Sequence, residues 1–242
     1  MTLAQLGGLF GAALAAFMIA MAPASMLLSM TSPDRFGIVH GRVDGRLWHA
    51  EVKDVYWRDG ALGDITIRLQ PASLLLGRLA AQFDASGANA TARGTLSRSL
   101  GSTTIIRDTN IALEVAGLPT LFSMAGQVQA EIDHLEYAPD GCVAVTARVA
   151  TDALTRGIAG LAWSGPPLSG DARCADGALV VSLTGMDDMQ QVTIDLVLKP
   201  DRSYQTRIGV TSRDASLAQL LPTLGFKREG DKLILVQEGT WG

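Results

Sequence analysis

The sequence predicts a mainly β protein: an N-terminal transmembrane helix, then an extended, twisted antiparallel sheet or sandwich with two short helices. Three observations predict this fold class. The chain opens on an uncharged apolar segment, short runs of alternating apolar and polar residues recur after it, and turn dipeptides separate those runs. Alternation with period two gives a strand one wet and one dry face. Short connections favour antiparallel pairing.

The apolar segment covers residues 1–33 and contains no charged side chain. Its continuous part, residues 6–24, extended by residues 26–28, supplies the roughly 20 apolar residues that a helix needs to cross a bilayer. The alternative is a cleaved signal peptide, because Ala22-Pro-Ala24 resembles a small-residue cleavage site. The run is longer than a usual signal core and no basic residue precedes it, which favours an uncleaved anchor. Either way, we expect residues 34–242 to form a β-rich domain outside the cytoplasm.

Strand alternation is plainest in six runs: residues 65–70, 111–115, 128–132, 143–149, 192–198 and 204–210. Turn signals lie between such runs, among them Asp59-Gly60, Asp140-Gly141, Asp176-Gly177, Pro200-Asp201 and Glu229-Gly230. An Asp-Gly pair between two apolar runs is a strong hairpin signal. The chain after the anchor is therefore expected to fold as consecutive antiparallel strands.

Two segments have helical character. Residues 72–79 follow Pro71, a residue favoured at the first position of a helix. In residues 214–224, Asp214 can cap the N-terminus, leucines recur with helical spacing, and Gly225 can end the helix. Pro222 is expected to truncate or kink its last turn. The match of Leu118-Pro-Thr-Leu121 with Leu221-Pro-Thr-Leu224 leaves open whether the domain has two similar halves or the match is chance.

The stretch that follows the apolar segment, residues 37–57, is expected to join the anchor to the sheet. Gly41 and Gly45 would let its strands turn close to the membrane, and Trp48 and Trp57 would pack them against the core. These four residues are predicted to have a structural role.

The two cysteines, Cys142 and Cys174, each lie beside a hairpin signal. Two cysteines in one domain outside the cytoplasm usually pair. We expect a structural disulfide rather than a metal site, because a metal site needs more ligands and no histidine lies near either cysteine in the sequence.

Composition and motifs argue against several classes of function. The formal net charge is −4 and basic residues are scattered, which argues against nucleic-acid binding. His40 and His49 would face opposite sides of a straight strand, and no serine lies in a Gly-x-Ser-x-Gly motif. We therefore expect no catalytic, metal-binding or cofactor-binding residue, no cofactor and no small-molecule substrate. The alternative of an enzyme, such as a hydrolase, has no recognisable nucleophile and base in its favour.

Four features in order resemble the bacterial type II secretion system protein N family. The first is the anchor followed by Gly41-Arg-Val-Asp-Gly-Arg-Leu-Trp48, and the second is Trp57 followed by Leu69-Gln-Pro-Ala-Ser-Leu-Leu-Leu-Gly-Arg-Leu79. The third is the cysteine pair with its Cys174-Ala-Asp-Gly177 turn. The fourth is the helix of residues 217–225 before a last strand. The resemblance covers residues 36–240. Position 46 is arginine where the family pattern has a small or hydroxyl residue.

The resemblance implies a non-enzymatic, single-pass component of the bacterial inner membrane with its C-terminal domain in the periplasm. Its partners would be other type II secretion subunits and membrane lipid, and its role the export of folded periplasmic proteins across the outer membrane. The alternative is a periplasmic lipid-handling module, because an antiparallel sheet with one dry face can form a groove for acyl chains.

Overall fold

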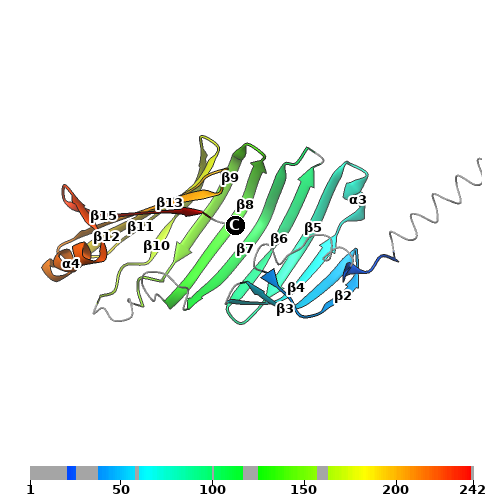
Figure 1. Cartoon of the computed structure of the whole chain (residues 1–242), viewed down its shortest axis with the longest axis horizontal. Coiled ribbons are helices and arrows are strands. Elements are labelled where there is room, and N and C mark those ends of the chain that lie inside the picture. The colour runs from blue at the N-terminus through cyan, green and yellow to red at the C-terminus, as the bar shows by residue number, and fades with distance from the viewer. Residues whose placement is uncertain are drawn as a thin grey trace, which may run out of the picture. The chain divides into compact units, whose positions relative to one another are not determined.

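A computed structural model describes residues 21–25, 38–57, 60–99, 101–116, 125–156 and 163–240 of the chain. The chain divides into two compact units, Met1–Thr91 and Ala92–Gly242. In each unit, strands pair antiparallel with strands that are near them in the sequence (Figure 1). The sequence predicts either an extended antiparallel sheet or a sandwich. The described strands of each unit form a sheet.

The first unit contains a sheet of five strands with the order β1-β3-β4-β5, and β2 pairs with β3. Its strands are β1 (Ile38–Val39), β2 (Val43–Arg46), β3 (His49–Trp57), β4 (Gly60–Leu69) and β5 (Arg78–Ser86). The short helix α3 (Pro71–Leu74) connects β4 to β5 and begins at a proline, as expected. The predicted helix over residues 72–79 is wrong in its length, because residues 75–77 form a turn and β5 begins at Arg78.

The second unit begins within β6, and its strands have the order β6-β7-β8-β9-β10-β11-β12-β13-β15-β14. They are β6 (Ala90–Ser99), β7 (Thr104–Ala116), β8 (Ala125–Ala138), β9 (Gly141–Thr151), β10 (Leu168–Ala175), β11 (Ala178–Met186), β12 (Gln190–Leu198), β13 (Ser203–Ser212), β14 (Lys227–Glu229) and β15 (Lys232–Thr240). The alternating runs predicted in this unit all lie in these strands. Asp176 and Gly177, both with positive φ, close the predicted hairpin between β10 and β11.

The second predicted helix is confirmed together with its caps. Helix α4 (Ala215–Leu220) begins after Asp214, whose carboxylate accepts the backbone N–H of Ser216 at 2.8 Å. Pro222 ends the α-helical geometry, and the 3₁₀ helix η2 (Leu221–Leu224) follows. Gly225, with φ +93°, terminates it in the left-handed conformation that glycine adopts without strain.

The expected anchor over residues 1–33 lies outside the described residues, except for residues 21–25. Within the part of the chain that is described, no helix is long and apolar enough to cross a membrane. The first copy of the Leu-Pro-Thr-Leu match, residues 118–121, also lies outside the described residues, so the expectation of two similar halves stays a prediction. Asp59 of the first turn signal is likewise outside them.

Candidate functional site: the apolar face and open edge of the C-terminal strands

The β2–β3 hairpin carries two residues of the predicted opening motif, Gly45 in β2 and Trp48 in the turn. Gly45 has φ +94°, and a Cβ added there would lie 2.2 Å from the carbonyl oxygen of His49, so glycine is required. Trp48 is half-buried in the turn, and its carbonyl accepts the backbone N–H of Leu69 at 3.1 Å. This turn therefore binds the end of β4 to the start of the sheet.

The other two residues of the motif lie at the far side of β3. A Cβ added to Gly41 would lie 3.1 Å from the Cβ of Asp54, so the chain passes closely there. Trp57 ends β3, where its backbone pairs with Ile38 and Gly60. The four residues are thus spread over both ends of one strand, and each has a place in the backbone framework.

The predicted disulfide between Cys142 and Cys174 is confirmed, with the two Cα atoms 5.5 Å apart. It joins the first residues of β9 to the last residues of β10. The backbone N–H of Cys142 also donates to the carbonyl of Gly177 at 2.8 Å. The bond therefore fastens the β8–β9 turn to the β10–β11 turn at one end of the second unit's sheet.

The three histidines do not form a common site. The chain turns between His40 and His49, so the straight strand assumed in the sequence analysis does not exist there. The Nε2 atom of His49 lies 3.6 Å from Glu51, and that of His134 lies 3.8 Å from Glu136. Among the residues described, no group of three acidic, histidine or cysteine side chains could hold a metal ion.

A hollow of about 300 Å³ lies where β8, β9 and β10 end, and Gln127, Gln129, Thr151, Asp152 and Leu168 contribute to its lining. The backbone N–H of Gln127 donates to Oδ1 of Asp152 at 2.5 Å, and Arg156 donates to Oδ2 at 3.3 Å. The hydrogen bond from Gln127, with a smaller contribution from Arg156, lowers the pKa of Asp152 despite partial burial. Asp152 therefore serves to hold these strand ends together.

Side chains on one face of strands β11, β12, β13 and β15 form apolar rows across the sheet. The strand register places Val192 beside Val210 and Leu233, and the next row along contains Leu183, Ile194, Ile208 and Leu235. Further rows contain Val181, Leu196 and Thr206, and then Leu179, Leu198 and Tyr204. The opposite face is mixed: Ser182 donates to Asp195 at 2.6 Å and Arg207 to Glu229 at 2.7 Å, but Val180 and Ile234 also lie on it and are buried. The predicted dry face therefore extends over four adjacent strands.

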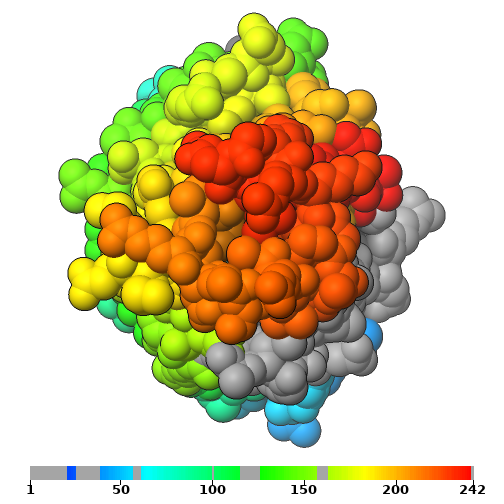
Figure 2. All heavy atoms as spheres, turned by 90° about the vertical axis from the view of Figure 1, so that its left-hand side faces the viewer, coloured from blue at the N-terminus to red at the C-terminus, as the bar shows by residue number. Residues whose placement is uncertain are grey.

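Helices α4 and η2 cover only one end of this dry face. Leu217, Leu221 and Phe226 are buried in one cluster with Val192, Val210 and their row. The next row packs partly against that cluster. Figure 2 looks onto this end, where the orange atoms of α4 and η2 lie beside the red atoms of β14 and β15. The two rows that contain Leu196 and Leu198 are outside the cluster and only half-buried.

Strand β15 pairs with β13 along nearly its whole length, but its other side pairs with β14 only at its start. It pairs with β13 from Leu233 to Thr240, whereas β14 pairs only with Lys232–Ile234. The chain enters β14 from η2 through Phe226, which is buried in the same cluster as Leu235. Among the residues described, Val236–Thr240 therefore form an open edge of the sheet.

Alternation of hydrogen bonds decides which backbone groups face this edge. Glu229 and Lys232 flank a two-residue turn and so form a hydrogen-bonded pair. Because the direction alternates along an antiparallel strand, every second residue after Lys232 turns its N–H and C=O away from β13. The register between β13 and β15 shows no shift up to Thr240. Val236, Glu238 and Thr240 thus direct backbone groups to the open edge.

Neither this edge nor the limited cover of the dry face was predicted from the sequence. Alternation marks Leu233, Leu235 and their neighbours as a strand, but it carries no information on how many strands flank it. One feature of the sequence does indicate the open edge, namely the short length of β14. Three charged residues lie between Phe226 and the Gly230 turn, too few to pair with all of β15.

Residues 37–235, most of the chain, match the family described as Type II secretion system (T2SS), protein N. No curated protein and no solved structure matches the chain. The match covers the strands of both units as far as the first half of β15, together with the disulfide and helix α4, and so agrees with the resemblance that the sequence motifs carry. The chain therefore belongs to the type II secretion system protein N family.

Proposed function

We propose that the protein is a non-enzymatic, single-pass component of the inner membrane that contributes to the export of folded proteins by the type II secretion system. The observation that carries this proposal is the family match over residues 37–235. The β domain would lie in the periplasm, where the Cys142–Cys174 disulfide can form and persist.

Contacts of residues 21–25 favour retention of the N-terminal segment. The backbone N–H of Leu47 donates to the carbonyl of Ala22 at 2.9 Å, and Pro23 forms a β-bridge with Arg46. Ala24 is 2% exposed. Cleavage after Ala24 would separate this packed segment from any anchor, so the packing supports an uncleaved chain. N-terminal sequencing of the protein from membranes checks this, and a chain that begins at Ser25 would contradict it.

The open edge of β15 is the surface that we assign to partner subunits. Unpaired strand edges recruit extended segments, which add to the sheet through backbone hydrogen bonds. Natural edges are usually protected by charge, proline, bulges or short length. β14 has such protection, since it is three charged residues long, but β15 contains no proline or register shift and exposes Val236 by 45%.

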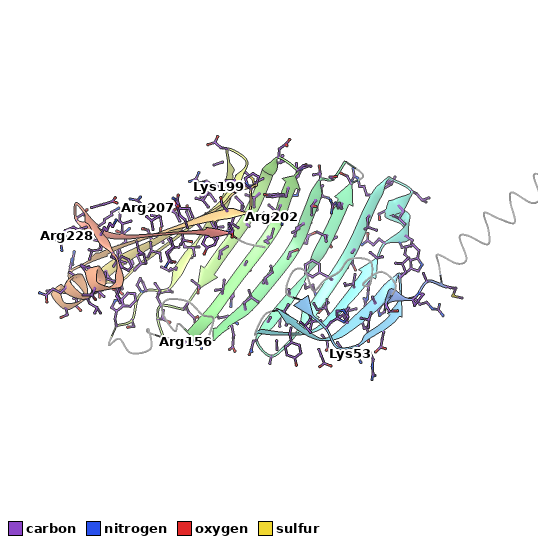
Figure 3. The ribbon with its side chains drawn as sticks, viewed as in Figure 1. Lys53, Arg156, Lys199, Arg202, Arg207 and Arg228 are labelled. Carbon is purple, nitrogen blue, oxygen red and sulfur yellow. A yellow bond between two sulfur atoms is a disulfide. The ribbon has the colours of Figure 1, made fainter. Side chains whose placement is uncertain are left out.

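Basic side chains lie near both ends of this edge. Arg228 is on β14, and Arg202 precedes Ser203, which pairs with Thr240 at the other end (Figure 3). Acidic side chains lie among them, because Glu238 is on the edge itself and Glu229 follows Arg228 on β14, where it pairs with Arg207. The edge therefore has mixed charge, and the partner segment is expected to be extended and to bind chiefly through its backbone.

A proline at Glu238 tests the edge, because it removes a backbone N–H that faces the edge and leaves the ladder to β13 intact. Glu238→Thr is the matched control, since it makes the same loss of charge and of the hydrogen bond from Gln205 without removing the N–H. A photo-crosslinking residue at Val236 is used in cells that secrete folded substrates. We expect the crosslink to another secretion subunit to persist in Glu238→Thr and to disappear in Glu238→Pro, with equal melting temperatures.

The assignment of the open edge to partner subunits and the role as a secretion component would be contradicted by different results. A crosslink to another subunit that persists in a folded Glu238→Pro variant would exclude the edge but leave the component role. Unchanged secretion after deletion of the gene, with working controls, would exclude the component role itself.

The half-buried apolar rows favour one alternative function, the lipid-handling module. Leu179, Val181, Leu196 and Leu198 form an apolar strip that α4 does not cover. An acyl chain could lie along such a strip, because it would bury apolar surface without an unsatisfied polar group. Native mass spectrometry of the purified protein tests it. Co-purified lipid that is lost in Leu196→Ser would support this function, and a lipid-free protein would count against it.

A further inference from the structure

Four leucines are exposed between the end of β4 and the start of β5. We call α3, the turn after it and the first two residues of β5, together residues 71–79, the leucine tip. The side chains of Leu75 and Leu76 are 90% and 77% exposed, and those of Leu74 and Leu79 are 46% and 47% exposed. Helix α3 has no buried residue. Apolar residues gathered at one exposed place mark a contact with a partner or a membrane.

The backbone of the tip is ordered by its own hydrogen bonds. The Ser73 hydroxyl donates to the carbonyl of Gln70 at 2.6 Å and accepts the backbone N–H of Ala80 at 3.2 Å. Gln70 donates its N–H to the carbonyl of Ala80 at 2.8 Å, and Gly77 donates to Leu74 at 3.0 Å. The leucines are therefore presented by a closed loop whose polar backbone groups are largely satisfied, which suits an apolar surrounding.

Neighbouring contacts place the tip at the end of the first unit's sheet where residues 22–24 join it. Leu69, the last residue of β4, donates its N–H to the carbonyl of Trp48 in the β2–β3 turn. In the same turn, Leu47 donates its N–H to Ala22. Residues 21–25 end the longest part of the apolar N-terminal segment. The leucine tip thus lies at the same end of the sheet as the chain that leaves the expected anchor.

The charge of this region suits an anionic lipid surface. Between Asp64 and Asp84 there is no acidic residue, and the charged residues are Arg68 and Arg78, both exposed. Arg78 lies between Leu76 and Leu79. Leucines with an adjacent arginine can enter the headgroup region of a bilayer while the guanidinium binds lipid phosphate.

From these observations we propose that the leucine tip inserts into the surface of a membrane that contains anionic lipid, as a second membrane contact beside the anchor. The proposal rests on the inner-membrane location given under the proposed function. Insertion at the tip would restrain the first unit against the bilayer, because a single anchor leaves a domain free to rotate about it.

The test uses the full chain in vesicles of phosphatidylcholine with or without phosphatidylglycerol. An environment-sensitive fluorophore is placed at Leu76→Cys, and lipids brominated in the upper acyl chain serve as quenchers. The native cysteines are joined to each other and do not react with the label. Tyr56→Cys is the matched control, since Tyr56 is 46% exposed and lies seven residues along β3 from His49, about 20 Å from the tip's end of the sheet.

We expect quenching of the Leu76 probe and none of the Tyr56 probe, and stronger quenching when phosphatidylglycerol is present. Leu75→Ser should lower the equilibrium constant for insertion about tenfold. Arg78→Gln should lower it about fivefold, and only in the vesicles that contain phosphatidylglycerol. Both positions are exposed, so neither variant should change the melting temperature.

Each other result overturns the proposal in a distinct way. Vesicles that float with the protein while the Leu76 probe stays unquenched would exclude insertion and leave the anchor in place. An unquenched Leu76 probe in vesicles that becomes shielded in native membranes would assign the tip to a protein partner. A full chain that does not float with vesicles would exclude the membrane location on which both proposals rest.

Discussion

The indole N–H of Trp163 donates a hydrogen bond to the side-chain oxygen of Gln190 at 2.6 Å, across 27 residues of sequence. The amide nitrogen of Gln190 donates in turn to the carbonyl of Ser164 at 2.7 Å and to Asp187 at 3.1 Å. Gln190 is 9% exposed and Trp163 packs against the buried cluster under α4. One buried glutamine thus holds Trp163 and Ser164, shortly before β10, against the core.

Replacement of Gln190 by alanine is expected to destabilise the second unit by about 1–3 kcal/mol, because it leaves the indole N–H and the Ser164 carbonyl without their partner. Urea unfolding monitored by tryptophan fluorescence measures the change. Gln191→Ala is the control, since Gln191 is the exposed neighbour in the same strand. Equal unfolding free energies for the two variants would contradict the role of this network.

The lowered pKa of Asp152 predicts a pH dependence of stability. The backbone N–H of Gln127 is the main cause of the lowered pKa, and Arg156 adds to it. A carboxyl group whose pKa is lower in the folded state stabilises the fold above its unfolded pKa of about 3.9, and this contribution is lost as the pH falls through the folded pKa. Asp152→Asn should therefore be less stable than the parent at neutral pH, and the difference should shrink below about pH 4. A difference that is constant from neutral to acidic pH would contradict this.

Loss of the Cys142–Cys174 disulfide is expected to cost about 3–4 kcal/mol in the chain-entropy account, because the bond closes a loop with a sequence separation of 32 residues. Cys142→Ser with Cys174→Ser should show this cost in urea unfolding. The parent protein in reductant is the control, since it should lose the same free energy without any substitution. A double variant as stable as the oxidised parent would show that strand pairing alone holds these turns.

Alanine substitutions at two glycines with positive φ distinguish the cost of backbone strain from the cost of a steric collision. Gly45 and Gly230 have φ of +94° and +65°, but a Cβ at Gly45 would meet the His49 carbonyl whereas a Cβ at Gly230 meets nothing within 4 Å. Gly230→Ala should cost about 1–2 kcal/mol from conformation alone, and Gly45→Ala clearly more. Comparison of the two melting temperatures measures the collision at the β2–β3 turn. Equal losses would show that the turn relaxes around a side chain.

Local sequence patterns determined much of this fold. Period two in residues 192–198 and 204–210 marks strands because successive side chains of an extended chain point to opposite faces. Asp214 sets the start of α4, Pro222 the change from α-helix to 3₁₀ helix, and Gly225 the end of η2. Each acts on backbone groups within a few residues. The pairing of Cys142 with Cys174 followed from the presence of two cysteines in one domain outside the cytoplasm.

The tertiary structure alone decided which surfaces remain without a partner. A leucine in a run such as Leu74-Leu75-Leu76 reads as core, yet these side chains are exposed because no described element packs over α3. Val236 alternates like any residue of an interior strand, and it lies at an edge because β14 ends after three residues. Burial and edge position depend on which distant segments meet, and that information is not contained in the period of any one segment.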